Sequence, residues 1–246
     1  MKTVFINCSP KKRFCASAYF LFLQRLFVGG KKISLKLRNR ADHEQILAEL
    51  RDADSVVFGL PLYVDGVPSH VLAFLEELEE YCRTNRCTFR VYCVANNGFI
   101  EGRQNEPLMQ VFAHFCGRAG LGWGGGVGIG GGVMLNVTRI LFIVDIGLLV
   151  LNTALSVIQT GNFFPASAWA SFAENAALLL YFNLGVLFYL GRMGAAIRKQ
   201  TSCGSRYTRI LIPSFVFILF ADIFFVIISV LEGGIFRGWL AKKQPD

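Results

Sequence analysis

The sequence is short of charged residues. Lys, Arg, Asp and Glu make up 17% of its 246 residues, against about 25% in an average soluble domain. Hydrophobic residues make up 53% and Phe alone fills 23 positions, which excludes a disordered chain. The net charge of +8 comes from scattered basic residues, so the sequence predicts no nucleic-acid partner.

The sequence also lacks the patterns of metal and disulfide sites. Its seven cysteines are an odd number, and none forms a Cys-x-x-Cys pair. This argues against a disulfide framework and against a zinc or iron–sulfur centre, and it favours reduced thiols in a cytosolic compartment. His43, His70 and His114 stand apart from one another, so we expect no metal site and no catalytic side chain.

The charge deficit is confined to one half of the chain. Residues 1–134 carry 16 basic and 12 acidic residues, whereas residues 135–246 carry 9 and 5. The sequence therefore predicts two domains, an ordinary α/β domain over 1–134 and a hydrophobic membrane region over 135–246.

Strand and helix patterns alternate in the first half. Short apolar runs predict strands, and periodic apolar positions between them predict helices. The expected strands are 3–7, 33–37, 55–60, 89–95 and 124–129, and the expected helices are 16–28, 42–52, 69–82 and 107–119. Five strands separated by helices indicate a doubly wound parallel α/β sheet.

Three loops follow expected strands, at the edge of the sheet where ligands bind in such folds. The loop at 9–17 combines two hydroxyls with three cations before a helix, a setting that suits an anion. The loop at 61–68 offers the flat ring of Tyr63 and the bend at Gly66. The loop at 96–102 offers side-chain amides and glycines. Each loop, taken singly, is equally well an ordinary turn.

These loops carry a resemblance. Ser9-Pro10-Lys11-Lys12-Arg13 with Ser17, then Gly59 to Ser69, then Asn97 to Gln104 together resemble the flavodoxin-like NAD(P)H-dependent FMN reductase family. The resemblance covers residues 1–134 and implies a five-stranded sheet of order 2-1-3-4-5. Phe14-Cys15-Ala16 departs from it, because the family commonly carries Gly, Ser, Thr or Asn at this part of the loop.

The resemblance implies FMN as cofactor and NAD(P)H as co-substrate, with an unknown electron acceptor. It implies that Ser9, Lys11 and Ser17 bind the FMN phosphate, and that the ring is contacted by Pro61, Leu62, Tyr63, Gly66, Asn97 and Gly98. It also implies a homodimer as one arrangement of the chain. Two alternatives stay open: an FMN electron carrier that does not oxidise NAD(P)H, and a non-catalytic membrane protein with a degenerate flavodoxin-like domain.

Three apolar segments in the second half predict an all-α transmembrane region: 140–158, 176–197 and 210–231. The first is open to a second interpretation, as the fifth helix of the α/β fold. Residues 192–209 are rich in Arg and Lys and contain no acid, whereas 160–175 contain neither Lys nor Arg. By the positive-inside rule this predicts three spans, with the N-terminal domain on the cytoplasmic side of the membrane.

Overall fold

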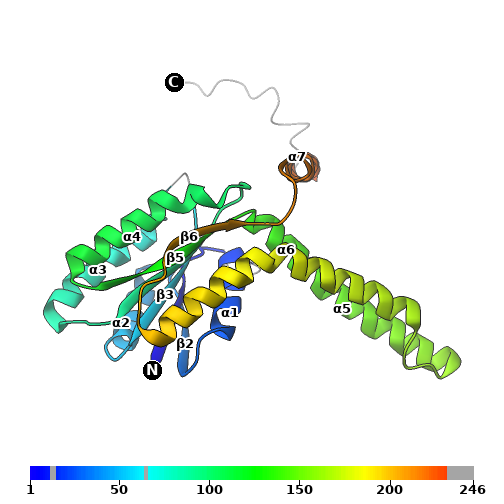
Figure 1. Cartoon of the computed structure of the whole chain (residues 1–246), viewed down its shortest axis with the longest axis horizontal. Helices are drawn as coiled ribbons and strands as arrows, with labels where there is room; N and C mark the ends of the chain where they lie inside the picture. The colour runs from blue at the N-terminus through cyan, green and yellow to red at the C-terminus, as the bar shows by residue number, and fades with distance from the viewer. Residues whose placement is uncertain (12–14, 64–65, 232–246) are drawn as a thin grey trace, which may run out of the picture. The chain divides into compact units, whose positions relative to one another are not determined.

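The computed structural model describes residues 1–11, 15–63 and 66–231. It divides into two compact units, Met1–Leu211 and Ile212–Asp246. Within the first unit a six-stranded parallel sheet has the order β2-β1-β3-β4-β5-β6 (Figure 1). The order of the first five strands is that of flavodoxin-like folds, so the predicted fold is confirmed.

The elements follow one another as strand and helix up to β5. In chain order the first nine are β1 Lys2–Asn7, α1 Ala16–Leu26, β2 Lys31–Lys36, α2 His43–Leu50, β3 Ser55–Pro61, α3 Ser69–Asn85, β4 Arg90–Asn96, α4 Glu106–Ala119 and β5 Gly122–Gly130. Short 3-10 turns precede α2 and α4, at Arg40–Asp42 and Gly102–Asn105. All nine elements expected from the sequence are present at these positions.

The central strands form because they are apolar on both faces. β3 and β4 are buried along almost their whole length, as expected for parallel strands covered by helices on both sides. Helices α2, α3 and α4 cover one face of the sheet, and α1 lies on the other (Figure 1). The sheet thus presents the carboxyl ends of β1, β3 and β4 along one edge.

The number of strands needs correction from five to six. After β5 the chain forms α5 Gly132–Thr160 and α6 Ala166–Lys199 and then returns to the sheet as β6 Gly204–Arg209. β6 pairs in parallel with β5, from Gly125 opposite Gly204 to Gly130 opposite Arg209. Residues 192–209 therefore contain the end of α6 and the whole of β6, and both belong to the compact unit that ends at Leu211.

The two long helices differ along their length. The buried residues of α5 all lie at or before Asn136, and those of α6 all lie at or after Asn183. Between these limits the two helices pack against each other, with the rings of Phe142 and Phe172 stacked at 5.4 Å. We call residues 137–182 the hairpin; Figure 1 shows it extending beyond the sheet.

The second half of α6 covers the sheet face next to α1. Tyr19 on α1 donates a hydrogen bond to Asn183 Oδ1 at 3.1 Å, and Tyr92 on β4 donates one to the carbonyl of Thr201 at 2.7 Å. This half of α6 takes the place of the expected fifth helix, so residues 140–158 do not. The expected span 176–197 is corrected accordingly, because from Asn183 onward it packs on the α/β unit.

The second unit contains α7 Ser214–Leu231, within the expected span 210–231. In all, α5, α6 and α7 are long and apolar enough to cross a membrane.

Candidate cofactor site

One pocket gathers the three loops that the sequence singled out. It lies at the carboxyl ends of β1, β3 and β4, where α1 and α5 begin. Its lining consists of Ser9, Lys11, Cys15, Ala16, Ser17, Pro61, Leu62, Tyr63, Asn96, Asn97, Gly98, Val133 and Asn136. The strand order changes direction between β1 and β3. Doubly wound sheets bind ligands at such switch points.

Eight of the nine predicted cofactor residues line this pocket. They are Ser9, Lys11, Ser17, Pro61, Leu62, Tyr63, Asn97 and Gly98. The ninth, Gly66, is not in the lining but pairs with Tyr63 through two backbone hydrogen bonds of 3.3 and 3.0 Å. Gly66 thereby shapes the loop that carries Tyr63. Three further residues of the 9–17 loop, Lys12, Arg13 and Phe14, lie outside the described residues.

One end of the pocket has the properties of an anion site. Helix α1 begins directly after Cys15, and Ala16 and Ser17 in its first turn line the pocket, so the unsatisfied N–H groups and the positive end of the helix dipole lie beside it. Ser9 and Ser17 are both buried there. Ser17 Oγ accepts a hydrogen bond from Asn96 Nδ2 at 2.9 Å, which leaves its own hydrogen available to donate. Lys11 lies exposed at the rim.

The other end suits a flat heterocycle. Asn97 is buried, its Nδ2 donates to the carbonyl of Glu101 at 3.0 Å, and its Oδ1 has no hydrogen-bond partner among the described residues. A buried acceptor without a partner costs about 1–3 kcal/mol, and a donor on a bound ligand would remove that cost. Beside it, a Cβ added to Gly98 would lie 3.7 Å from Val133 Cγ2, an ordinary van der Waals contact, so Gly98 brings the backbone close to the start of α5.

Tyr63 also lines the pocket and is 41% exposed. Partial burial is the main cause that raises the pKa of its phenol above the ordinary value, and the nearby Cys15 adds to it. The phenol is therefore neutral at physiological pH and offers an uncharged ring.

Five lining residues were not among the predicted cofactor contacts: Cys15, Ala16, Asn96, Val133 and Asn136. Asn96 supports the site by binding both Ser17 Oγ and the carbonyl of Leu60, each at 2.9 Å. Val133 and Asn136 lie in the first turns of α5, between the predicted strand 124–129 and the apolar segment 140–158, where the sequence analysis assigned no function. The glycines at 130–132 lie where β5 ends and α5 begins. They were the one sequence signal that could have pointed to the start of α5 as part of the pocket.

None of the three histidines lines this pocket, and two of them have polar partners in the described structure. His43 Nδ1 is 2.7 Å from Glu77 Oε2, and His70 Nε2 is 3.0 Å from the carbonyl oxygen of Cys8. Within residues 1–11, 15–63 and 66–231, no group of three or more His, Cys, Asp or Glu side chains could hold a metal ion.

The sequence matches no family model and no curated protein. Solved structures are similar to it at low identity. The Trp repressor binding protein from Bacillus subtilis is 20% identical over 52% of this chain and 84% of its own, with a TM-score of 0.42. The NAD(P)H:quinone oxidoreductase from Methanothermobacter marburgensis is 14% identical over 56% and 92%, with a TM-score of 0.47. The azoreductase from Bacillus anthracis is 12% identical over 78% and 99%, with a TM-score of 0.41.

Proposed function

We propose that the protein is a membrane-tethered, FMN-dependent oxidoreductase that takes hydride from NAD(P)H and passes electrons to an acceptor. The observation that carries this proposal is the convergence of eight predicted FMN residues on one pocket at the carboxyl edge of the sheet. An anion end and a flat, partly apolar end lie side by side in it, which is the arrangement that a phosphate-bearing ring cofactor requires.

The residues of the chain bind and orient the cofactor. Ser9, Ser17 and the first amides of α1 would hold the phosphate, and Lys11 would add positive charge. Asn97 Oδ1 would accept a hydrogen bond from a donor on the ring, and Tyr63 would lie against the ring. FMN supplies the hydride and electron chemistry when bound, so the pocket needs no side chain that acts as acid or nucleophile.

The pocket encloses about 130 Å³, less than the roughly 300 Å³ at the lower end of ordinary ligand cavities. A cofactor held here would therefore extend beyond the enclosed volume, and the part outside would be accessible to a hydride donor and an electron acceptor.

The test is an absorption spectrum of the detergent-purified protein, followed by titration with FMN. We expect FMN binding at micromolar concentration, and a dissociation constant raised about tenfold by Ser17→Ala, since losing a hydrogen bond to a charged group costs about 1.5 kcal/mol or more. Ser69→Ala at the exposed start of α3 is the matched control and leaves the constant unchanged. Absence of FMN binding in the wild type would overturn the proposal.

Reduction by NAD(P)H separates an enzyme from a simple electron carrier. We expect mixing the FMN-loaded protein with NADH or NADPH to bleach the oxidised flavin band directly. A flavin that binds but is not reduced by either nucleotide would identify a carrier instead.

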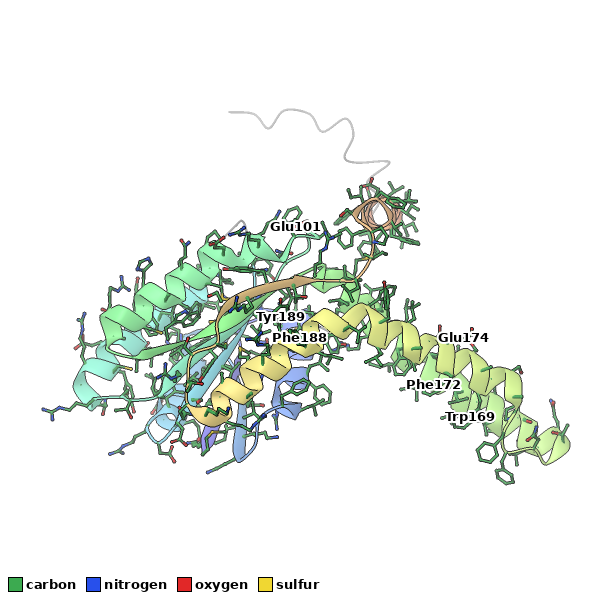
Figure 2. The ribbon with its side chains drawn as sticks, viewed as in Figure 1. Glu101, Trp169, Phe172, Glu174, Phe188 and Tyr189 are labelled. Carbon is green, nitrogen blue, oxygen red and sulfur yellow. The ribbon has the colours of Figure 1, made fainter. Side chains whose placement is uncertain are left out.

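Membrane tethering is supported by the surface of the hairpin. Residues 137–182 include no buried residue, yet from 140 to 182 they carry only two charges, Asp145 and Glu174. Figure 2 shows Trp169, Phe172 and Glu174 along this part of α6. An apolar surface this large is typical of contact with lipid. At 1.5 Å per residue the α5 arm over 140–160 is about 31 Å long, close to the roughly 30 Å of a hydrocarbon core.

The pairing of β5 with β6 limits how the hairpin can cross the membrane. Because β5 and β6 are neighbours in one sheet, the chain between them leaves and returns on the same side of the membrane. Two crossings by α5 and α6 satisfy this requirement, and α7 then adds a third. The five basic residues between 192 and 209 stay on the side of the α/β unit, which the positive-inside rule makes cytoplasmic.

Cysteine labelling in intact cells tests this topology. We expect Asn162→Cys at the hairpin tip to react with a membrane-impermeant maleimide from outside. Asn85→Cys at the end of α3 is the control, and it should react only after permeabilisation. Equal labelling of both variants in intact cells would exclude the arrangement.

A further inference from the structure

A cavity lies between α5 and α6 within the hairpin, and it shares no lining residue with the pocket at the edge of the sheet. Its volume is about 290 Å³, close to the roughly 300 Å³ at which sites for small ligands begin. The lining residues of each helix are spaced by three and four positions and so share one face. They are Thr138, Leu141, Phe142, Val144, Asp145 and Leu148 on α5, and Asn175, Leu178, Leu179 and Phe182 on α6.

One residue of this cavity is a carboxylate with an unsatisfied oxygen. Asp145 Oδ2 is enclosed by protein atoms and has no hydrogen-bond partner among the described residues. None of the ion pairs in the described part of the chain involves Asp145. A carboxylate removed from water without compensation is costly, and ionisable residues inside membrane segments usually mark a functional site. An occupant that brings a donor and a positive charge would remove this cost.

The basic residues closest in sequence contact other groups. The guanidinium of Arg139 lies 5.0 Å from the centre of the Tyr19 ring on α1, and that of Arg192 lies 6.0 Å from the ring of Phe188. Residues 140–182 contain no Lys or Arg. The hairpin thus supplies no cation of its own for Asp145.

The rest of the lining indicates the kind of cation. A metal ion would find one carboxylate, the Asn175 amide and the Thr138 hydroxyl, whereas Ca²⁺ takes about six to eight oxygen ligands. The other seven lining residues are aliphatic or aromatic, which is unfavourable for a hydrated ion. They favour an organic cation, because they bury its apolar body and the Phe rings add a cation–π attraction.

The cavity is accessible from the outer surface of the hairpin. Leu148 and Leu178 both line it, and they are 50% and 49% exposed. Asp145 follows Ile140 by five positions, so in the proposed topology it lies about 8 Å along the helix from the start of the apolar segment. A molecule in the bilayer can therefore reach Asp145 with a charged group near the cytoplasmic side while its apolar body stays among leucines and lipid chains.

We propose that this cavity binds a lipophilic organic cation, a protonated amine on an apolar body, which enters from the bilayer. The ammonium donates hydrogen bonds to Asp145 Oδ2 and to the side-chain oxygen of Asn175. Hydrogen bonds between charged groups are about twice as strong as neutral ones, and lipid chains offer no competing donor. The proposal rests on the proposed membrane position of the hairpin and not on the flavin chemistry, so its failure leaves the FMN titration unaffected.

The test uses the full chain in phospholipid nanodiscs and three probes with the same apolar body: phenylbutylamine, phenylbutanol and phenylbutyrate. Isothermal titration calorimetry measures binding, and the heat from protein-free nanodiscs is subtracted. We expect saturable binding of the amine at one site per chain, with a dissociation constant at least about tenfold below that of the alcohol, and no binding of the carboxylate. Absence of saturable amine binding, or equal constants for the amine and the alcohol, would overturn the proposal.

Two carboxylate variants locate the site. Asp145→Asn keeps the shape and removes the charge, so it should raise the dissociation constant of the amine at least about tenfold, to that of the alcohol. Glu174→Gln is the matched control, because Glu174 is exposed on the same hairpin and lies outside the cavity lining (Figure 2). It should leave the constant within about twofold. Equal weakening by both variants would assign the binding to the general charge of the hairpin and overturn the proposal.

Thermal unfolding without a probe separates a binding role of Asp145 from a structural one. A carboxylate oxygen without a partner does not hold α5 to α6, so Asp145→Asn should leave the midpoint unchanged or raise it. Leu148→Trp fills the cavity without changing the charge and should raise the amine constant about tenfold. A lower midpoint for Asp145→Asn would assign the carboxylate to helix packing, and unchanged amine binding by Leu148→Trp would place the probe elsewhere. Either result would overturn the proposal.

Discussion

The two halves of α6 belong to one continuous helix and lie in different surroundings. Residues 166–182 contain no buried residue, whereas residues 183–199 bury Asn183, Val186, Leu190, Met193 and Ile197. Those five positions are spaced by three and four residues, as one packed face of a helix requires. The first half carries Glu174 as its only charged residue, a composition that suits lipid, and the second half is apolar toward a protein core.

Close approach distinguishes the halves as well. A Cβ at Gly194 would lie 2.5 Å from Phe27 Cβ and 2.7 Å from its carbonyl oxygen, and one at Gly185 would lie 2.5 Å from Thr208 Oγ1. The first half has no glycine at all. Glycine therefore marks where α6 touches α1 and β6, although glycine alone is not decisive, since Gly147 on α5 has nothing within 4 Å of its Cβ position.

The largest expected difference between the halves comes from removing one leucine from each. Leu190 is fully buried, and Leu180 is 55% exposed. Leu190→Ala should destabilise the α/β unit by about 2–5 kcal/mol, the usual cost of a cavity in a packed core. Leu180→Ala should cost no more than about 0.5 kcal/mol. Thermal unfolding in detergent measures both, and equal losses would show that residues 166–182 are also packed against protein.

Adding one methyl group makes the same comparison from the opposite direction. Gly194→Ala places a carbon against the backbone of Phe27, which cannot move as a flexible side chain can, and should cost about 1–3 kcal/mol. Gly147→Ala on the hairpin meets open space and should be neutral or slightly stabilising, because Ala favours helix by about 1 kcal/mol over Gly. Thermal midpoints of the two variants check this, and a stable Gly194→Ala protein would contradict the contact with α1.

The alternating half of the molecule was predictable from sequence because each element is specified locally. Apolar runs such as Ser55 to Leu60 and the periodic positions of 69–82 require no knowledge of distant residues. The site residues followed from the same logic, because the ends of parallel strands meet at one edge. That is why Ser9, Tyr63 and Asn97, which are far apart in sequence, line one pocket.

The second half could not be predicted to the same extent, because composition does not say what covers an apolar surface. Lipid and a sheet face favour the same residues, so the segment 176–197 gave no sign that its environment changes at Asn183. β6 was missed for a different reason. Its six residues include two arginines and a single β-branched residue, and only pairing with β5, some 75 residues earlier, makes them a strand.

A hydrogen bond at Asn183, where the buried half of α6 begins, should contribute less to stability than the apolar contacts do. Tyr19→Phe removes the bond to Asn183 Oδ1 and leaves that buried acceptor without its donor, so we expect a loss of about 0.5–1.5 kcal/mol. Tyr189 is the control: Figure 2 shows it on the second half of α6 beside Phe188, and its hydroxyl donates to no described residue in the structure's hydrogen-bond pattern. Tyr189→Phe should leave the thermal midpoint unchanged. An unchanged midpoint for Tyr19→Phe would show that the two helices are held together by apolar contacts alone.

Alkaline pH should lower the stability of the contact between residues 183–199 of α6 and the sheet, and it should leave the hairpin unaffected. This is the smallest of the expected effects. Burial raises the pKa of Tyr92, which holds the end of α6 through the carbonyl of Thr201. Its folded-state pKa is above the unfolded value of about 10, so the unfolded chain loses the proton first, and stability is complete below pH 10 and falls as the pH rises beyond it. Between pH 9 and 10.5 the loss from this group should be below about 1 kcal/mol. Tyr92→Phe should flatten the dependence of the midpoint on pH in this window, and an unaltered slope would assign the alkaline loss to other groups.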